Sequence, residues 1–130
     1  MTDRELINMA YAAAKNAYAP YSGLKVGAAV ECADGSVFTG VNVENTALGS
    51  SVCAETAAVT AAVTAGKRRF VRIAIWADRT YYYVPCGNCR QILQEFAPNI
   101  EVLCVKGDGR YMSFPLKGLL PEPMSREVLE

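Results

Sequence analysis

A hairpin followed by alternating helices and strands is the feature that most restricts how this chain can fold. From Leu24 to Cys32 every second residue is apolar, which indicates a half-buried strand, and Asp34-Gly35 predicts a turn into a strand over residues 37–43. The later segments predict helix, strand, helix, strand and strand, at residues 52–65, 71–77, 87–96, 101–105 and 111–114. This order indicates an α/β fold, with a mixed sheet of about five strands in three α/β/α layers.

Both ends of the chain fit this arrangement. Thr2 and Glu5 form a capping-box pattern, and apolar residues with helical spacing then continue toward Pro20: Leu6, Met9, Ala10, Ala13 and Ala17. Leu116 to Leu120 predicts a short helical turn near the C-terminus. The chain has 130 residues, 52% of them apolar, so it can bury one core, and we expect a single domain over residues 1–130.

Charge and composition limit the partners of the chain. Thirteen Lys and Arg balance thirteen Asp and Glu, which disfavours nucleic acid as a ligand, so we expect a small molecule. Charged residues interrupt the first seventeen positions and no eighteen apolar residues run together, so we expect neither a signal peptide nor a membrane span. We therefore expect a cytoplasmic protein, whose five cysteines favour metal binding or catalysis over disulfide bonds.

Cysteines at two predicted helix starts indicate a metal site. Cys86 and Cys89 are three residues apart at the start of one helix, and Cys53 lies at the start of another. If these helix ends face each other, three sulfurs converge where the helix dipoles lower the thiol pKa and favour the thiolate form. Three protein ligands leave a tetrahedral zinc ion with one position for water, which is typical of a catalytic site. Glu55, two residues after Cys53, is the candidate that moves the proton of that water.

Simpler interpretations of the same residues remain open. Cys-x-x-Cys at a helix start is also typical of a thiol redox motif. A structural zinc site needs a fourth ligand, which Cys32 or Cys104 could supply, although both fit better as small residues of buried strands. Glu55 alone is typical of a solvated charge that complements a helix dipole. A zinc-binding module without turnover therefore competes with an enzyme.

Several stretches together resemble the cytidine deaminase family. They are Cys-Ala-Glu at 53–55, Pro-Cys-Gly-x-Cys-Arg-Gln at 85–91, Tyr-Ala-Pro-Tyr-Ser at 18–22, Val-Gly-Ala-Ala at 26–29, Asn-Val-Glu-Asn at 42–45 and Leu-Leu-Pro at 119–121. They span nearly the whole chain and resemble the short, three-cysteine zinc type, which implies a homotetramer with shared active sites. The resemblance implies zinc-dependent hydrolysis of cytidine and deoxycytidine to uridine and deoxyuridine with release of ammonia, in pyrimidine salvage.

The same resemblance implies roles for individual residues. Cys53, Cys86 and Cys89 would hold one Zn²⁺ per chain. Glu55 would protonate N3 of the cytosine ring, and then the departing amine, during hydrolytic attack at C4. Substrate contacts would come from five residues, with the ribose hydroxyls held by the first two: Asn42, Glu44, Ala54, Leu24 and Val26. The simpler interpretation of Asn42 and Glu44 is a polar strand terminus.

The zinc site departs from the family pattern at Thr56, where arginine is usual in the three-cysteine members. Three thiolates on Zn²⁺ leave a net negative charge. We therefore expect this charge to be balanced by Arg90, by N–H groups of the helix starts and by the Thr56 hydroxyl.

The substrate region departs from the pattern as well. Leu24 and Met124 stand where aromatic residues are usual, and Tyr81 to Tyr83 adds aromatic surface before the zinc cysteines, as a pocket wall or a subunit contact. A deaminase of a modified cytosine nucleoside, such as blasticidin S, is therefore a second hypothesis. The stretch Asn42 to Asn45 favours an ordinary ribose or deoxyribose.

Overall fold

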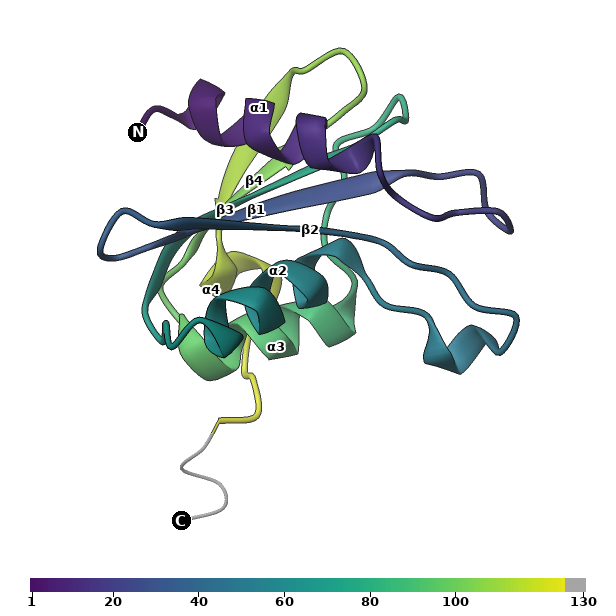
Figure 1. Ribbon diagram of the computed structural model, residues 1–130. Helices are drawn as coiled ribbons and strands as arrows, with labels where there is room; N and C mark the ends of the chain where they lie inside the picture. Colours follow the sequence, from purple (N-terminus) through teal and green to yellow (C-terminus); the bar gives the residue numbers. More distant parts are fainter. Residues whose placement is uncertain (126–130) are drawn as a thin grey trace.

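Five strands form one mixed sheet in the order β2-β1-β3-β4-β5 (Figure 1). The structure is a computed structural model that describes residues 1–125. Strands β3 and β4 are parallel, and the other neighbouring pairs are antiparallel. The strands are β1 Val26–Cys32, β2 Val37–Val41, β3 Phe70–Ala77, β4 Glu101–Val105 and β5 Tyr111–Pro115. The predicted mixed sheet is therefore confirmed.

Helices cover both faces of this sheet. Helix α1 (Asp3–Ala14) lies on one face, whereas α2 (Ala54–Thr64), α3 (Gly87–Phe96) and the short α4 (Leu116–Leu119) lie on the other (Figure 1). A 3-10 turn, η1 (Leu48–Ser50), lies in the loop between β2 and α2. The predicted three α/β/α layers are confirmed.

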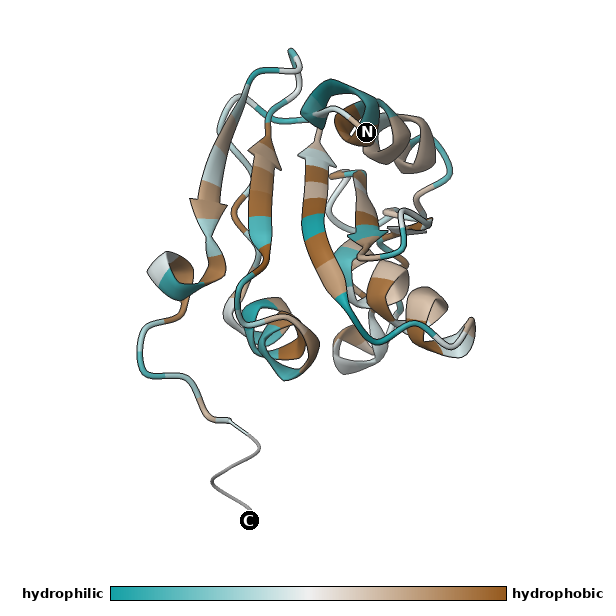
Figure 2. Cartoon of the chain, turned by 90° about the vertical axis from the view of Figure 1, so that its left-hand side faces the viewer, coloured by the Kyte–Doolittle hydropathy of each residue, from teal (hydrophilic) through white to brown (hydrophobic). Residues whose placement is uncertain are grey.

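Strand β1 is buried on both faces, which corrects the half-buried strand expected from its alternation. All seven of its residues are buried. Ala28 and Val30 belong to the core beneath α2 and α3, whereas Ala29 packs in a second core beneath α1. Figure 2 shows the same arrangement, with predominantly apolar central strands between the helix layers. A central strand between two helix layers has no solvent-facing side.

Two glycines allow the helices to come very close to the sheet. A Cβ added to Gly27 would lie 2.1 Å from the carbonyl oxygen of Ala10 in α1. A Cβ added to Gly40 would lie 2.3 Å from the backbone nitrogen of Ala58 in α2. Because α2 consists mainly of small residues, its backbone packs directly on β2, as expected for a central helix. This close packing determines where the N-terminus of α2 lies.

The ends of several elements differ from the prediction, and three differences bear on the site. The Thr2–Glu5 capping box is present, but α1 ends at Ala14 rather than continuing toward Pro20. Strand β2 ends at Val41, because its partner β1 begins only at Val26. Helix α2 begins at Ala54 instead of residue 52, because the two residues before it take extended conformations.

Candidate metal centre

The N-terminal ends of α2 and α3 bring three cysteines together. Cys53 is the N-cap of α2, Cys86 is the N-cap of α3, and Cys89 lies in the first turn of α3. Their three sulfur atoms all lie within 4.8 Å of one another. The convergence predicted from the two helix starts is confirmed.

A short backbone bridge positions Cys53. Val43 and Val52 exchange two backbone hydrogen bonds, of 3.0 and 2.9 Å, and Tyr18 pairs with Val43 as well. Since Val52 directly precedes Cys53, this bridge fixes the approach of the chain to the first cysteine. It also places the segment after β2, which carries Asn42 and Glu44, next to the start of α2.

Glu55 is buried in the first turn of α2 without a partner. The residue is 1% exposed, and neither oxygen of its carboxylate has a hydrogen-bond partner among residues 1–125. Burial raises the pKa of this carboxyl group. The interpretation of Glu55 as a solvated helix residue is therefore wrong. A buried polar group without a partner costs stability, which points to a role in chemistry.

Burial also raises the pKa of the Cys53 and Cys89 thiols, and the neighbouring charge of Glu55 raises both further. This direction is opposite to the lowering expected from the helix ends, because desolvation disfavours the thiolate. A divalent cation among the sulfurs would reverse this balance, since its charge favours the thiolate. Three sulfur donors so close together suit a soft tetrahedral ion such as zinc.

The remaining two cysteines lie away from this cluster. Cys32 in β1 and Cys104 in β4 are buried in the apolar core, as expected of small core residues. Burial raises the pKa of the Cys104 thiol to about 12. Within residues 1–125, the three clustered cysteines are the one group of three or more potential His, Cys, Asp or Glu ligands that lie this close. Three sulfur donors without a fourth cysteine among the described residues are typical of a catalytic zinc site, and a structural one would need a fourth ligand.

Thr56 lies against the cysteine cluster. Its Oγ1 atom is 3.7 Å from Sγ of Cys89, within hydrogen-bond distance for sulfur. The side chain of Cys89 is fully buried, so few other donors can reach it. Donation from this hydroxyl to a Cys89 thiolate fits the expected balancing of charge, which stays a prediction.

Arg90 contacts carbonyl groups instead of sulfur atoms. Its Nε donates to the Pro85 carbonyl at 2.7 Å, and its Nη1 donates to the Leu119 carbonyl at 2.6 Å. Direct hydrogen bonding of Arg90 to the cysteines, which charge balancing would favour, is not found among the described residues. The side chain instead supports the backbone just before Cys86.

Asn42 binds the start of β1 with both ends of its amide. Its Oδ1 accepts the Val26 N–H at 2.9 Å, and its Nδ2 donates to the Leu24 carbonyl at 2.8 Å. The structure therefore brings together three of the residues expected to contact substrate. Leu24 is half-buried and Val26 is fully buried. Within this chain, each therefore supports the position of Asn42 through its backbone and packs against the core through its side chain.

Glu44 holds the loop between α1 and β1. One carboxylate oxygen accepts the N–H groups of Tyr21 and Ser22, both at 3.0 Å, and the other accepts the Ser22 hydroxyl. These bonds lower the pKa of Glu44, with the Ser22 hydroxyl as the largest cause, so the carboxylate is ionised. Ser22 is a site residue that sequence reasoning did not single out, although it lies in the Tyr-Ala-Pro-Tyr-Ser stretch.

Ala54 and Met124 have different surroundings. Ala54 is fully buried at the first position of α2, between Cys53 and Glu55 in the sequence. Met124 is 64% exposed, and its carbonyl accepts a hydrogen bond from Gln91 of α3. The expected substrate contact of Met124 therefore has no support from burial within this chain.

The three tyrosines before the cysteines are held by cations. The Arg79 guanidinium lies 5.9 Å from the ring centre of Tyr81 and 5.7 Å from that of Tyr83, and Lys106 Nζ lies 5.1 Å from that of Tyr82. Tyr83 is half-buried, and burial raises the pKa of its phenol, with smaller contributions from Glu55 and the cysteines. The Tyr83 hydroxyl therefore stays protonated in the same surroundings as the cluster. In the sequence, the feature that could have identified Tyr83 as a neighbour of the cluster is its position three residues before Cys86.

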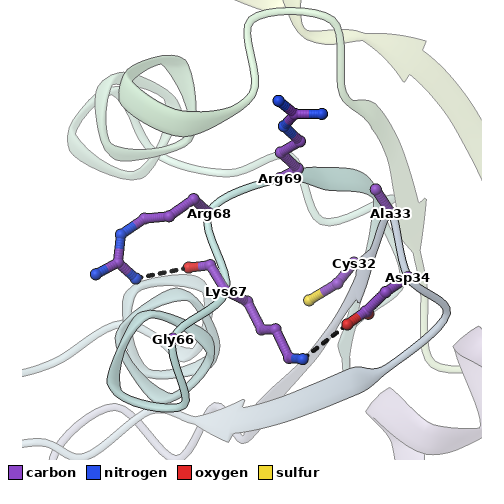
Figure 3. Close-up of a pocket in the computed structure, with 7 residues that line it drawn as sticks. All are labelled: Cys32, Ala33, Asp34, Gly66, Lys67, Arg68 and Arg69. Atoms are coloured by element: carbon purple, nitrogen blue, oxygen red, sulfur yellow. Dashed lines mark hydrogen bonds and ion pairs between the residues drawn. The ribbon is translucent and has the colours of Figure 1, made fainter.

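A separate pocket lies at the opposite end of α2 (Figure 3). Its lining includes Cys32, whose sulfur points inward, and Lys67, whose Nζ is 2.7 Å from Oδ2 of Asp34. Arg68 donates to the carbonyls of Val63 and Lys67, so most polar groups here already have partners. Helix α2 places this pocket about 16 Å from Cys53, given a rise of about 1.5 Å per residue. It is not part of the cysteine site.

No helix within residues 1–125 is long and apolar enough to cross a membrane.

Comparisons with known proteins agree with this geometry. Residues 1–105 match the family model of the cytidine and deoxycytidylate deaminase zinc-binding region. The chain is 42% identical over 114 residues to a probable cytidine deaminase of Dictyostelium discoideum, covering 87% of this chain and 77% of the relative. It is 39% identical over 127 residues to a cytidine deaminase of Halalkalibacterium halodurans, covering 96% of each.

Solved structures show the same similarity. The crystal structure of cytidine deaminase from Burkholderia pseudomallei superposes with a TM-score of 0.92 at 42% identity, covering 95% of this chain and all of the other. The cytidine deaminase of Mycobacterium tuberculosis superposes with a TM-score of 0.82 at 37% identity, covering 95% of this chain and 98% of the other.

Proposed function

The chain belongs to the cytidine and deoxycytidylate deaminase family, and we propose that it hydrolyses cytidine and deoxycytidine to uridine and deoxyuridine, releasing ammonia. One observation carries this proposal. Glu55 has a buried carboxylate without a hydrogen-bond partner among the described residues, and it lies two residues after Cys53, one of the three clustered cysteines. A redox pair or a structural metal site has no need of such a carboxylate.

The cysteine cluster fits one zinc ion per chain. Cys53, Cys86 and Cys89 would hold it, and the open fourth position suits a hydrolytic site. When bound, zinc supplies Lewis acidity that lowers the pKa of a water molecule from ~15.7 toward ~7. A nucleophile is then available at neutral pH in a chain that has no histidine.

Glu55 would move the protons of this reaction. In the overall hydrolysis, a C–O bond forms at C4 of the cytosine ring and the bond to the amino group breaks. The two protons of water end on N3 and on the departing ammonia. Burial raises the pKa of Glu55, which makes its carboxylate a better proton acceptor than that of an exposed glutamate.

The sugar would bind at Asn42 and Glu44. Each keeps hydrogen-bonding capacity beyond its present contacts: the second N–H of the Asn42 amide and further lone pairs on the Glu44 carboxylate. A neutral donor beside an anionic acceptor suits the hydroxyls of ribose or deoxyribose. The base would lie against the buried Ala54, with Leu24 and Val26 beside it.

Assembly as a homotetramer with shared active sites is part of the proposal. Large apolar side chains are exposed around the loops near the site, and their coverage by another subunit would explain them: Tyr18, Tyr21, Val43, Leu48 and Val52. Sedimentation velocity of the zinc-loaded protein tests the assembly, and a monomer with full activity would contradict it. We place the enzyme in pyrimidine salvage in the cytoplasm.

One experiment tests the function. Zinc per chain is measured, and ammonia release is then followed with cytidine, deoxycytidine, cytosine and blasticidin S, for the wild type and Glu55→Gln. We expect one zinc per chain, turnover of the two ordinary nucleosides, and loss of turnover in the variant. Bound zinc without turnover of any cytosine compound would leave a binding module, and turnover of blasticidin S alone would establish the modified-nucleoside alternative.

The thiol redox hypothesis predicts a different pattern. Its activity would survive chelation of the metal and would be lost with Cys86→Ser. We expect the deaminase activity to disappear when zinc is removed and to return when zinc is added back.

A further inference from the structure

Cys86 is the least anchored of the three clustered cysteines. Cys89 is fully buried within α3, and Cys53 directly follows the Val43–Val52 bridge. Cys86 is exposed and directly follows an irregular segment, residues 81–85. In the described part of the chain, two hydrogen bonds hold the backbone of that segment. One is the bond from the Tyr83 N–H to the Val105 carbonyl, at 3.3 Å.

Arg90 makes the second bond and holds the chain on both sides of Cys86. Its Nε donates to the carbonyl of Pro85, the residue before Cys86, at 2.7 Å. Its backbone N–H donates to the carbonyl of Cys86 itself, at 3.0 Å. The side chain of Arg90 thus fixes the peptide that leads into Cys86, while its backbone fixes the peptide that follows.

The other end of the guanidinium is attached to helix α4. Its Nη1 donates at 2.6 Å to the carbonyl of Leu119, the last residue of α4. Carbonyls at a helix C-terminus have no partner within the helix, so the guanidinium satisfies one of them. Helix α4 is anchored in the core by Leu116, which is fully buried. The Pro85 carbonyl is therefore tied to the core through one side chain.

We propose that Arg90 is a positioning residue for Cys86, and that its bridge between the Pro85 and Leu119 carbonyls slows the loss of the bound metal. The inference rests on the proposed zinc centre. It differs from charge balancing, because the guanidinium donates to two carbonyls and not to a sulfur. A lysine would keep the positive charge, but its compact ammonium group cannot reproduce the planar fork that spans both carbonyls.

The rate of zinc transfer from the loaded protein to a chromophoric chelator tests this role. Arg90→Lys and Arg90→Ala are compared with Gln91→Ala, which removes the neighbouring bond to the Met124 carbonyl but leaves the Pro85 carbonyl untouched. We expect both Arg90 variants to release zinc about tenfold to a hundredfold faster, as when other supports of metal ligands are removed. Gln91→Ala should release zinc at the wild-type rate.

Two results would overturn the inference. If Arg90→Lys released zinc at the wild-type rate, the charge alone would explain the residue. If Gln91→Ala released zinc as fast as the Arg90 variants, general loosening of α3 would explain it. A wild-type protein that takes up no zinc would instead contradict the proposed metal centre itself.

Hydrogen exchange gives a second readout that does not depend on release. In zinc-loaded Arg90→Lys we expect faster exchange at the amides of residues 83, 84, 86 and 87, with unchanged exchange in β1, β3 and β4. Exchange at residues 83–87 equal to that of the wild type would contradict the bridge. This comparison also holds if Arg90→Ala fails to fold, because it uses the variant that keeps the long charged side chain.

Discussion

Two glutamates are buried in the described part of this chain, one on each face of the sheet, and their surroundings are opposite. Glu31, on the side of α1, is 8% exposed and accepts a hydrogen bond from Nε of Arg72 at 2.8 Å. Arg72 also donates to Asp3 of α1 and to the carbonyl of Met1. Glu55, on the side of α2 and α3, is 1% exposed and has no hydrogen-bond partner.

The difference separates a structural site from a reactive one. The bond to Glu31 is the main cause that raises the pKa of Arg72, so the guanidinium stays charged, and its ion pairs tie β1, β3 and α1 together. Glu55 makes no comparable bond within residues 1–125, and a buried carboxylate without a partner costs stability, which points to a role in chemistry. The same residue type, buried in both places, is therefore part of a structural network on one face and of the proposed reaction site on the other.

The largest expected effect comes from removing the metal ligand next to Glu55. Cys53→Ala should lose both bound zinc and deamination, because two sulfurs cannot replace three. Zinc per chain is measured by inductively coupled plasma spectrometry, and ammonia release is measured in parallel. Cys104→Ala is the matched control, because it removes a buried sulfur that lies outside the cluster, and it should retain zinc. A Cys53→Ala protein with one zinc per chain would contradict the assigned cluster.

Glu55→Gln should keep the metal and lose the proton transfer. We expect turnover to fall about 10²-fold to 10⁴-fold, the usual contribution of a positioned acid or base. The denaturation midpoint should not fall, since the amide replaces a buried carboxylate that makes no hydrogen bond. Steady-state kinetics with cytidine and urea unfolding measure the two quantities. A clear loss of stability at unchanged turnover would show that Glu55, like Glu31, has a structural role.

For the Arg72 network on the face of α1, we expect a loss of stability without a loss of turnover. Arg72→Ala leaves Glu31 and Asp3 without their shared partner, so the free energy of unfolding should fall by about 1–3 kcal/mol. Urea unfolding measures this change. Turnover per folded molecule should be unchanged, and a drop in turnover comparable to that of Glu55→Gln would erase the distinction between the two faces.

The smallest effect is expected at Thr56. Removing its hydroxyl in Thr56→Val deletes the contact to Cys89 Sγ, which should speed zinc release by about twofold to tenfold, the equivalent of one hydrogen bond. Thr56→Ser keeps the hydroxyl and serves as the control. Equal release rates for the wild type and both variants would show that Thr56 does not support the sulfur.

Much of the fold could be predicted because it depends on local patterns. The Thr2–Glu5 cap, the Asp34-Gly35 turn and helix α3 depend on residues that are close in sequence, and the structure confirms them. The burial of β1 on both faces could not be predicted, because it depends on helices that are distant in sequence. The alternation in that strand is the same whether one face or both faces are covered.

The candidate site shows the same division. Residue type and spacing alone indicated three sulfur ligands and a carboxylate, because an i, i+3 pair at a helix start must point its side chains the same way. The partners of Arg90 could not be predicted, since Pro85 and Leu119 come together only when α4 packs beside α3. The raised pKa values of the Cys53 and Cys89 thiols follow from burial, which is also a property of packing.

The sequence by itself determined which atoms are available for chemistry and in which order the elements follow, because both are local properties. Only the tertiary structure decided how these atoms are surrounded. It isolates Glu55, pairs Glu31 with Arg72, and turns Arg90 toward two carbonyls. The physical reason is that desolvation and hydrogen-bond satisfaction depend on every element packed around a group, and these neighbours come from distant parts of the chain.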